Sequence, residues 1–252
     1  MNLKPAIRLS FLALIILLVL YYLTQGGYMG DNPVGRATGY EQPLVVPASY
    51  AFAIWSIIYL LMFAFPIYHW FKRPEGHPLW KKVHLLFALN MVANGLWLVC
   101  ASYNWQILMV LIILFMLYTL YTINDLLIAI EVEEKPQNYW LERIGFSIYF
   151  AWITLASALN ISTLLAFYGF EGLGISQVIW SVIFLIVVSL IAALVYLKYR
   201  DRAYVGVVLW AFTAIVVKQL DPYPMIAYTA IAMMVIFVIL IFTKVPTKAA
   251  SV

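Results

Sequence analysis

The chain has 252 residues, of which 65% are hydrophobic and only 10% charged, and its mean hydropathy is +0.96. This composition excludes a soluble globular domain and indicates an integral membrane protein. The modest net charge of +4 is better explained by membrane orientation and contact with anionic lipid than by nucleic-acid binding. A single cysteine, Cys100, excludes an intramolecular disulfide.

Long, continuous apolar runs predict helices, since a spanning helix needs about 20 apolar residues and barrel strands are shorter and alternating. We therefore expect an all-α protein with eight transmembrane helices. In chain order, the predicted spans are 6–23, 49–71, 83–102, 105–130, 142–168, 174–197, 203–219 and 224–243.

The first span could be mistaken for a secretory signal peptide, because Lys4 and Arg8 precede its apolar run. The following "YYLTQGGYMGDN" lacks a convincing small-x-small cleavage site. We expect a retained membrane anchor.

The distribution of basic residues supports eight spans and places both termini in the cytoplasm, where Lys and Arg accumulate. Only Arg36 and Lys218 fall on the extracytoplasmic side. The cytoplasmic side holds Lys4, Arg8, Lys72, Arg73, Lys81, Lys82, Lys135, Arg143, Lys198, Arg200, Arg202, Lys244 and Lys248. We expect a multi-pass protein of the bacterial inner membrane.

The segment 24–48, between the first two spans, is the longest extracytoplasmic connection. Its Gly, Pro, Asn and Asp residues disfavour a long helix, yet it is too apolar for a simple linker. We predict a lid over the helix ends, with Tyr40, Pro47 and Tyr50 as lid residues. An ordinary surface loop is the alternative.

Three spans carry aromatic and amide residues at helical spacing, so that each group lies along one face. They are Trp55, Tyr59, Met62 and Pro66 on the second span, Phe87, Asn90, Asn94, Trp97 and Ala101 on the third, and Tyr149, Trp152, Ala156, Asn160 and Thr163 on the fifth.

An amide facing lipid without a partner is costly, so Asn90, Asn94 and Asn160 must face protein, water or ligand. Hydrogen bonds between helices are one explanation, each contributing about 0.6 kcal/mol. The other is a largely apolar cavity with a few converging polar groups, as in small-molecule sites. Spacing alone leaves both open.

Three stretches in order, "PASYAFAIWSIIYLLM" (47–62), "NMVANGLWLV" (90–99) and "YFAWITLASALN" (149–160), resemble the TspO family of tryptophan-rich sensory proteins. This family is also called the translocator or peripheral benzodiazepine receptor family. Its pattern is matched by Pro47, Trp55 and Tyr59, by Asn94 and Trp97, and by Trp152, Ala156 and Asn160.

The resemblance implies a five-helix bundle that holds a porphyrin, a sterol or a synthetic aromatic ligand below the first loop. With the residues of the three faces, the expected ligand-binding set is Trp55, Tyr59, Asn90, Asn94, Trp97, Tyr149, Trp152, Ala156 and Asn160. A porphyrin or haem-like molecule would be the ligand, and no cofactor is expected otherwise.

The resemblance extends over about residues 5–168, and it departs from the family pattern at Tyr50, which replaces a tryptophan and stands one residue closer to Trp55. We predict a bundle at 1–168 and a three-helix extension at 169–252. Within the extension, "IWSVIFL" (179–185) echoes "IWSIIYL" (54–60), through either duplication or chance. Trp180 and Trp210 are candidates for lining a second cavity.

Two ionisable residues lie near predicted span ends. Asp125 is expected at the cytoplasmic interface, with a proton-relay role as the alternative. Lys218 is expected to form an interfacial ion pair with Asp221. His69, His77 and His84 flank one basic loop, and we predict no metal site there.

The sequence contains no recognisable catalytic constellation. Light-dependent porphyrin breakdown by pocket tryptophans is the one reaction that the resemblance suggests, and we leave enzymatic activity open. The leading hypothesis is a membrane receptor or carrier for a hydrophobic small molecule, with a homodimer as a candidate assembly. The alternatives are a secondary transporter that uses Asp125 and the last three spans, and a structural assembly module.

Overall fold

The computed structural model describes residues 2–30, 42–73, 75–170 and 172–243. The described residues form eight long helices and no extended strand, and each helix is long and apolar enough to cross a membrane. Their bounds are α1 Lys4–Gln25, α2 Ile54–Lys72, α3 Leu79–Ser102, α4 Gln106–Glu133, α5 Gly145–Phe167, α6 Gln177–Tyr199, α7 Arg202–Gln219 and α8 Pro224–Phe242. The predicted eight-helix fold is confirmed.

Short helical turns extend two of the spans. The 3₁₀ helix η1 (Ser49–Ala53) leads into α2, and the π-helix η2 (Trp140–Ile144) leads into α5. A further 3₁₀ turn, η3 (Gly172–Gly174), lies between α5 and α6. With η1 and η2 included, the second and fifth spans become 24 and 28 residues long.

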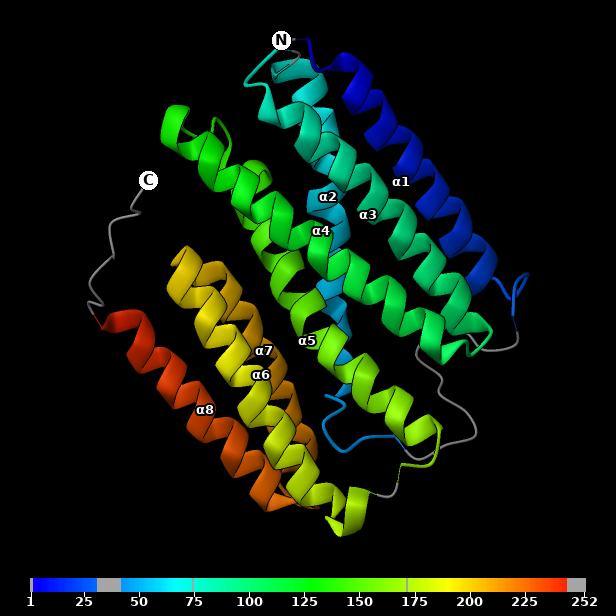
Figure 1. The fold of residues 1–252 in the computed structure, drawn as a ribbon, viewed down its shortest axis with the longest axis vertical. Helices are drawn as coiled ribbons and strands as arrows, with labels where there is room; N and C mark the ends of the chain where they lie inside the picture. Colours follow the sequence, from blue (N-terminus) through cyan, green and yellow to red (C-terminus); the bar gives the residue numbers. More distant parts are fainter. Residues whose placement is uncertain (1, 31–41, 74, 171, 244–252) are drawn as a thin grey trace.

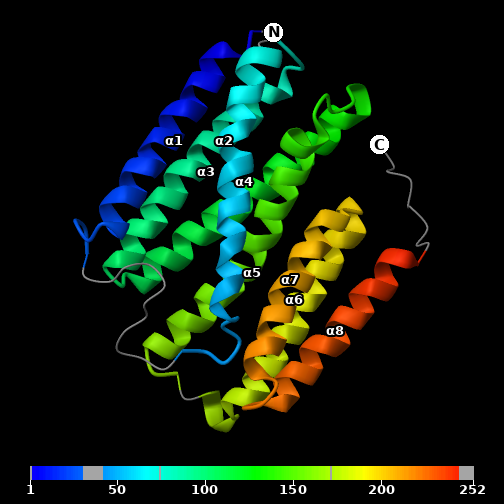
Figure 2. The ribbon, with the colours of Figure 1, turned by 180° about the vertical axis from the view of Figure 1, so that it is seen from behind.

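The helices form two groups (Figure 1). In the first, α1, α3, α4 and α5 lie side by side in that order, and α2 crosses behind them, in front in the reverse view of Figure 2. In the second, α8 packs against α6 and α7. The groups meet mainly where α7 packs against α5. Because the spans alternate in direction, α1 begins and α8 ends on the same side of the bundle.

Tight connections have clear local causes. Between α6 and α7, Arg200 adopts a left-handed conformation at φ 53°, and Asp201 then caps α7 by accepting hydrogen bonds from the backbone N–H groups of Ala203 and Tyr204. The α3–α4 hairpin turns at Asn104, at φ 56°. Pro224 occupies the first turn of α8, where its missing N–H costs nothing.

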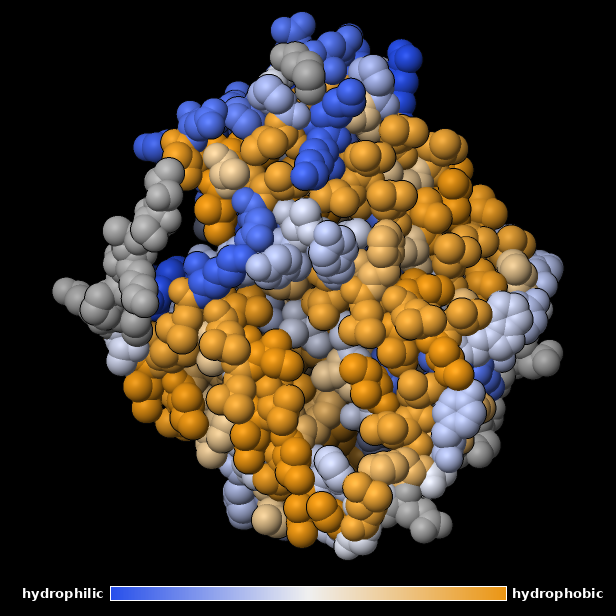
Figure 3. All heavy atoms as spheres, in the orientation of Figure 1, coloured by the Kyte–Doolittle hydropathy of each residue, from blue (hydrophilic) through white to orange (hydrophobic). Residues whose placement is uncertain are grey.

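The surface has the character of a membrane protein. In Figure 3 hydrophobic residues cover most of the visible face, and hydrophilic residues gather on the side where α1 begins. Large apolar side chains such as Leu60, Leu111, Leu194 and Val217 are more than half exposed. A chain that leaves so much apolar surface uncovered is suited to lipid rather than to water.

Candidate functional site

Six of the nine predicted ligand-binding residues, carried by α2, α3 and α5, line a cavity of about 90 Å³, which we call the aromatic pocket. Trp55, Trp97 and Trp152 contribute indole rings, and Asn94 and Asn160 contribute amides. The other lining residues are Val45, Pro47, Phe52, Ile113, Met116, Ile153, Leu155, Ala156, Leu159, Phe184, Ala211, Phe212 and Ile215.

The aromatic rings hold one another in fixed orientations. Trp55 and Trp152 meet edge to face, with ring centroids 6.4 Å apart and planes at 85°. Tyr59 stacks on Trp55 at 5.2 Å, and Phe52 meets Trp152 edge to face at 5.7 Å. Such pairs favour one arrangement over others, so the walls of the pocket are largely preformed.

The two amides are already hydrogen-bonded within the protein. Asn94 accepts a bond from the Tyr59 hydroxyl at 3.1 Å and donates one to the Tyr149 hydroxyl at 2.8 Å. Asn160 accepts a bond from the Trp97 indole N–H at 3.1 Å and donates to its own helix. Both amides therefore orient aromatic side chains around the pocket.

Trp152 differs from these residues. Its side chain is buried, with 4% of its surface exposed, and its indole N–H has no hydrogen-bond partner among the described residues. Buried polar groups are almost always paired, so an unpaired donor on a cavity wall requires an explanation. A ligand acceptor in the aromatic pocket would supply the missing bond.

Helices beyond residue 168 complete the pocket. Their contribution was not predicted from the sequence. Phe184 of α6 and Ala211, Phe212 and Ile215 of α7 close the side that α2, α3 and α5 leave open. These are apolar residues on apolar helices, and no polar contrast marks their inward faces. The echo of "IWSIIYL" at 179–185 and the candidate Trp180 pointed to the region around Phe184.

Comparison with known proteins agrees with the resemblance that these motifs carry. The family model described as TSPO-like protein matches residues 7–243. The chain belongs to the TSPO-like protein family. No curated protein and no solved structure matches it. The TSPO-like match continues past residue 168 and includes the helices that complete the pocket. As a TSPO-like protein with eight apolar helices, the chain is an integral, multi-pass membrane protein.

Three residues of the expected ligand-binding set lie outside the lining of this TSPO-like pocket. Tyr59 and Tyr149 lie behind Asn94 and hold its amide. Asn90, one turn earlier on α3, donates to the Met116 carbonyl at 3.0 Å and the Thr119 hydroxyl at 2.7 Å, both on α4. Asn90 therefore joins two helices, which was the structural alternative for these amides.

The lid residues that the structure describes lie on the segment that leads into α2. Pro47 lines the pocket, whereas Tyr50 packs edge to face on Trp210, whose indole N–H donates to the Ala51 carbonyl at 3.0 Å. Tyr40 lies outside the described residues.

The segment that carries Pro47 is fastened to α7 by three hydrogen bonds. The N–H of Ala48 donates to the Ala214 carbonyl at 3.1 Å, Lys218 Nζ donates to the Val46 carbonyl at 3.1 Å, and the Gln219 amide donates to the Leu44 carbonyl. The expected ion pair of Lys218 is therefore wrong, because the ammonium group turns toward this segment. This segment, residues 44–48, contributes Val45 and Pro47 to the wall of the pocket, and we call it the strap.

Asp125 has partners on a neighbouring helix. Its carboxylate lies 2.7 Å from Lys198 Nζ and accepts a hydrogen bond from Tyr199 at 2.7 Å, both on α6. The Lys198 and Asp125 side chains are 43% and 42% exposed. Asp125 therefore joins α4 to α6 through half-exposed contacts.

Two of the three histidines are buried, rather than flanking the loop. His84 Nε2 lies 3.0 Å from His69 Nδ1, and His84 Nδ1 lies 2.9 Å from Ser10 Oγ. His77 instead lies 2.9 Å from the exposed carboxylate of Glu133. Within the described ranges, no three His, Cys, Asp or Glu side chains are grouped to hold a metal ion.

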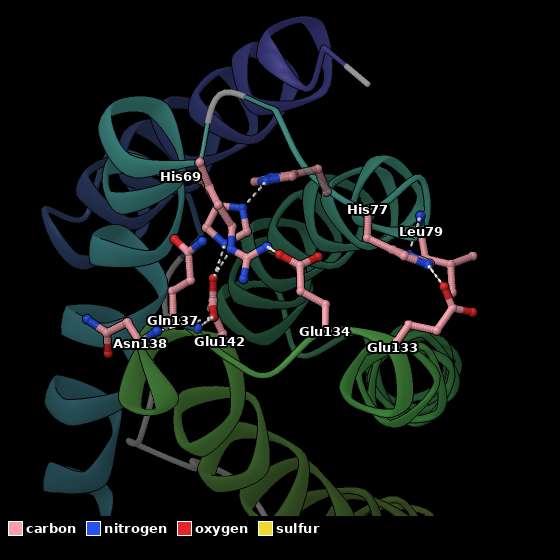
Figure 4. Close-up of polar contacts among 10 residues, drawn as sticks. His69, His77, Leu79, Glu133, Glu134, Gln137, Asn138 and Glu142 are labelled. Carbon is pink, nitrogen blue, oxygen red and sulfur yellow. Dashed lines mark hydrogen bonds and ion pairs between the residues drawn. The ribbon is translucent and has the colours of Figure 1, made fainter.

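The buried histidines continue into an ion pair, shown in Figure 4. His69 Nε2 lies 3.3 Å from Glu142 Oε1, which is 2.6 Å from Arg73 Nε. Glu142 also accepts hydrogen bonds from the backbone N–H groups of Gln137 and Asn138, at 2.7 and 3.2 Å. This buried polar cluster ties α1, α2 and α3 to the start of the fifth span.

Proposed function

We propose that this protein is a membrane receptor or carrier that binds a flat hydrophobic ligand, such as a tetrapyrrole or a sterol, in the aromatic pocket. The observation that carries the proposal is the unpaired, buried indole N–H of Trp152, a residue in the wall of a largely apolar cavity. A ligand with an acceptor at its edge would pair this donor and release the cost of leaving it unsatisfied.

The remaining walls suit a flat, apolar molecule. Trp55, Trp97 and Phe52 offer aromatic faces and edges for stacking, with aliphatic side chains between them. Because Asn94 and Asn160 are engaged with tyrosine and tryptophan, they fix the shape of the pocket and leave Trp152 as the specific polar contact. A few fixed polar groups in an apolar cavity are typical of small-molecule sites.

The size of the pocket restricts how such a ligand is held. Its volume of about 90 Å³ is below that of the roughly 150 Å³ apolar cavity known to admit benzene. A ligand with several rings therefore needs the walls to move, or must extend beyond the pocket. Val45 and Phe184 line both the pocket and a larger cavity in the same bundle, so movement of these two side chains would enlarge the pocket.

Titration with protoporphyrin, followed by the absorbance of the porphyrin, tests the proposal in detergent-purified protein. Trp152→Phe retains an aromatic ring but removes the indole N–H together with part of the ring system, so we expect an affinity at least about tenfold lower, of which the hydrogen bond contributes about 1–2 kcal/mol. Asn94→Ala releases Tyr59 and Tyr149 and should also weaken binding.

Trp140→Phe provides a matched control, because Trp140 is 65% exposed and lies far from the pocket lining. Its affinity should equal that of the unmodified protein. Saturable binding that neither Trp152→Phe nor Asn94→Ala weakens would place the ligand elsewhere and refute the assignment.

A further inference from the structure

A second cavity, of about 450 Å³, lies between α5 and α6 beneath residues 42–45; we call it the α5–α6 cavity. It is about five times larger than the aromatic pocket and falls within the range of ligand sites. Its lining consists of Gln42, Pro43, Leu44, Val45, Ala158, Ile161, Ser162, Leu165, Ala166, Phe170, Gly172, Ile175, Gln177, Trp180, Ser181, Ile183, Phe184, Val187, Val188 and Ile191.

The α5–α6 cavity opens toward lipid. Its rim includes Ile161 and Leu165 of α5 and Val187 and Ile191 of α6, whose side chains are 41%, 43%, 47% and 42% exposed. In Figure 3 the apolar face is hollowed in the area where Figure 1 places the space between α5 and α6. Since both rims are membrane-spanning helices, the opening faces the side of the bundle, where a molecule dissolved in the bilayer can enter.

The two cavities meet at shared residues. Val45 of the strap and Phe184 of α6 line both of them. Phe184 is half-buried and packs on the apolar core without a polar anchor. A phenyl ring held only by apolar contacts can change rotamer at modest cost, and its movement would connect the cavities.

The neighbouring aromatic residue is fixed. Trp180, one turn before Phe184, donates its indole N–H to the Gly172 carbonyl at 2.8 Å and meets Phe170 edge to face at 5.7 Å. The pair repeats the spacing of Trp55 and Tyr59 in the echoed motif, so each cavity has one tryptophan of this motif in its wall. Phe184 is therefore the movable member of an otherwise anchored pair.

We propose that the α5–α6 cavity is the lateral route by which a membrane-dissolved ligand reaches the aromatic pocket, with the Phe184 side chain as the gate. The proposal rests on the proposed function. It accounts for a pocket that is nearly closed on the described faces yet serves a ligand that partitions into lipid.

The test compares association and dissociation rates of protoporphyrin with protein reconstituted in lipid nanodiscs, measured by stopped flow. Ser162→Phe adds a phenyl ring to the wall of the α5–α6 cavity and narrows it, whereas Leu164→Phe, two residues along the same helix and outside both linings, is the matched control. Phe184→Ala removes the gate.

A route affects the height of a barrier and leaves the end states unchanged. We therefore expect Ser162→Phe to slow association and dissociation together by about tenfold or more, with an equilibrium affinity within about threefold of the unmodified protein. Phe184→Ala should accelerate both rates, and Leu164→Phe should change neither.

Unchanged rates in Ser162→Phe and Phe184→Ala, with binding still weakened by Trp152→Phe, would overturn the route and leave the proposed function standing. A large loss of affinity in Ser162→Phe, caused by faster dissociation alone, would also overturn it, because the α5–α6 cavity would then be the binding site itself. Binding insensitive to Trp152→Phe and Asn94→Ala would refute the proposed function, and the route with it.

Discussion

Replacing Glu142 by glutamine tests whether the buried polar cluster stabilises the fold. The Glu142 and Arg73 side chains are only 1% and 2% exposed, and the carboxylate lies close to Arg73 Nε, His69 Nε2 and two backbone N–H groups. Glutamine retains the shape and can still accept the backbone hydrogen bonds. The variant therefore removes the negative charge and leaves Arg73 buried.

The size of the expected loss of stability depends on the partners that Arg73 keeps in the variant. Removing one member of a buried ion pair costs about 3–5 kcal/mol, because the other charge is left uncompensated. Arg73 keeps an ion pair with Glu134, whose side chain is 34% exposed and thus partly screened. We expect the lower end of the range, a decrease of about 3 kcal/mol in the free energy of unfolding.

Glu133→Gln is the matched control. It breaks a similar pair with His77, but the Glu133 side chain is 69% exposed, so the expected cost is about 0–1 kcal/mol. Unfolding by sodium dodecyl sulfate in mixed micelles, followed by helical circular dichroism, gives both values. Equal decreases in the free energy of unfolding of Glu142→Gln and Glu133→Gln would refute the reasoning. The double variant Arg73→Gln/Glu142→Gln should recover part of the lost stability, because it leaves no unpaired buried charge.

The remaining predictions concern packing and the α4–α6 contact. At Gly95 of α3, an added Cβ would lie 2.8 Å from the Leu20 side chain of α1, so Gly95→Leu should force these helices apart and destabilise by about 1–3 kcal/mol. A melting temperature in detergent equal to that of Leu96→Ala, a change at a 46% exposed neighbour, would contradict it. Asp125→Asn breaks a half-exposed pair with Lys198 and should cost less than about 1 kcal/mol, with protoporphyrin affinity unchanged. A loss of binding in Asp125→Asn would instead indicate a functional role for that carboxylate.

The membrane-spanning segments were predictable because bilayer thickness sets a minimum length of apolar chain. The errors at span ends have a physical cause as well. The third span was predicted to begin at 83, yet α3 begins at Leu79, before two lysines. Lys81 and Lys82 lie on the exposed side of the first turns, while Trp80 is 1% exposed and faces the core. His84 is consequently inside the bundle rather than beside a loop.

Sequence spacing identified the face of α3 but could not separate the roles of its two amides. Residues four apart on a helix are offset by about 40°, so Asn90 and Asn94 point in similar but unequal directions. The Met116 carbonyl and Thr119 hydroxyl of α4 lie within reach of Asn90, whereas Tyr59 and Tyr149 lie within reach of Asn94. Which partner is available depends on how neighbouring helices pack, and helical spacing does not contain that information.

The contribution of α6 and α7 was harder still to predict. An apolar residue in a membrane helix is equally suited to lipid, to a neighbouring helix or to a cavity wall. Phe212 is buried because α7 packs against α5, a contact between segments far apart in the chain. A sequence rich in such residues predicts the number of helices well and their inward faces poorly.

The wall that α6 and α7 provide has a consequence for how this chain can be divided. A version ending at residue 168 would keep Trp55, Trp97 and Trp152 but lose Phe184, Phe212 and the helix to which the strap is fastened. Lipid chains would then reach the indole rings directly, and the enclosed pocket would become a trough. The first five helices carry the recognisable motifs, yet they enclose a ligand only as part of the whole bundle.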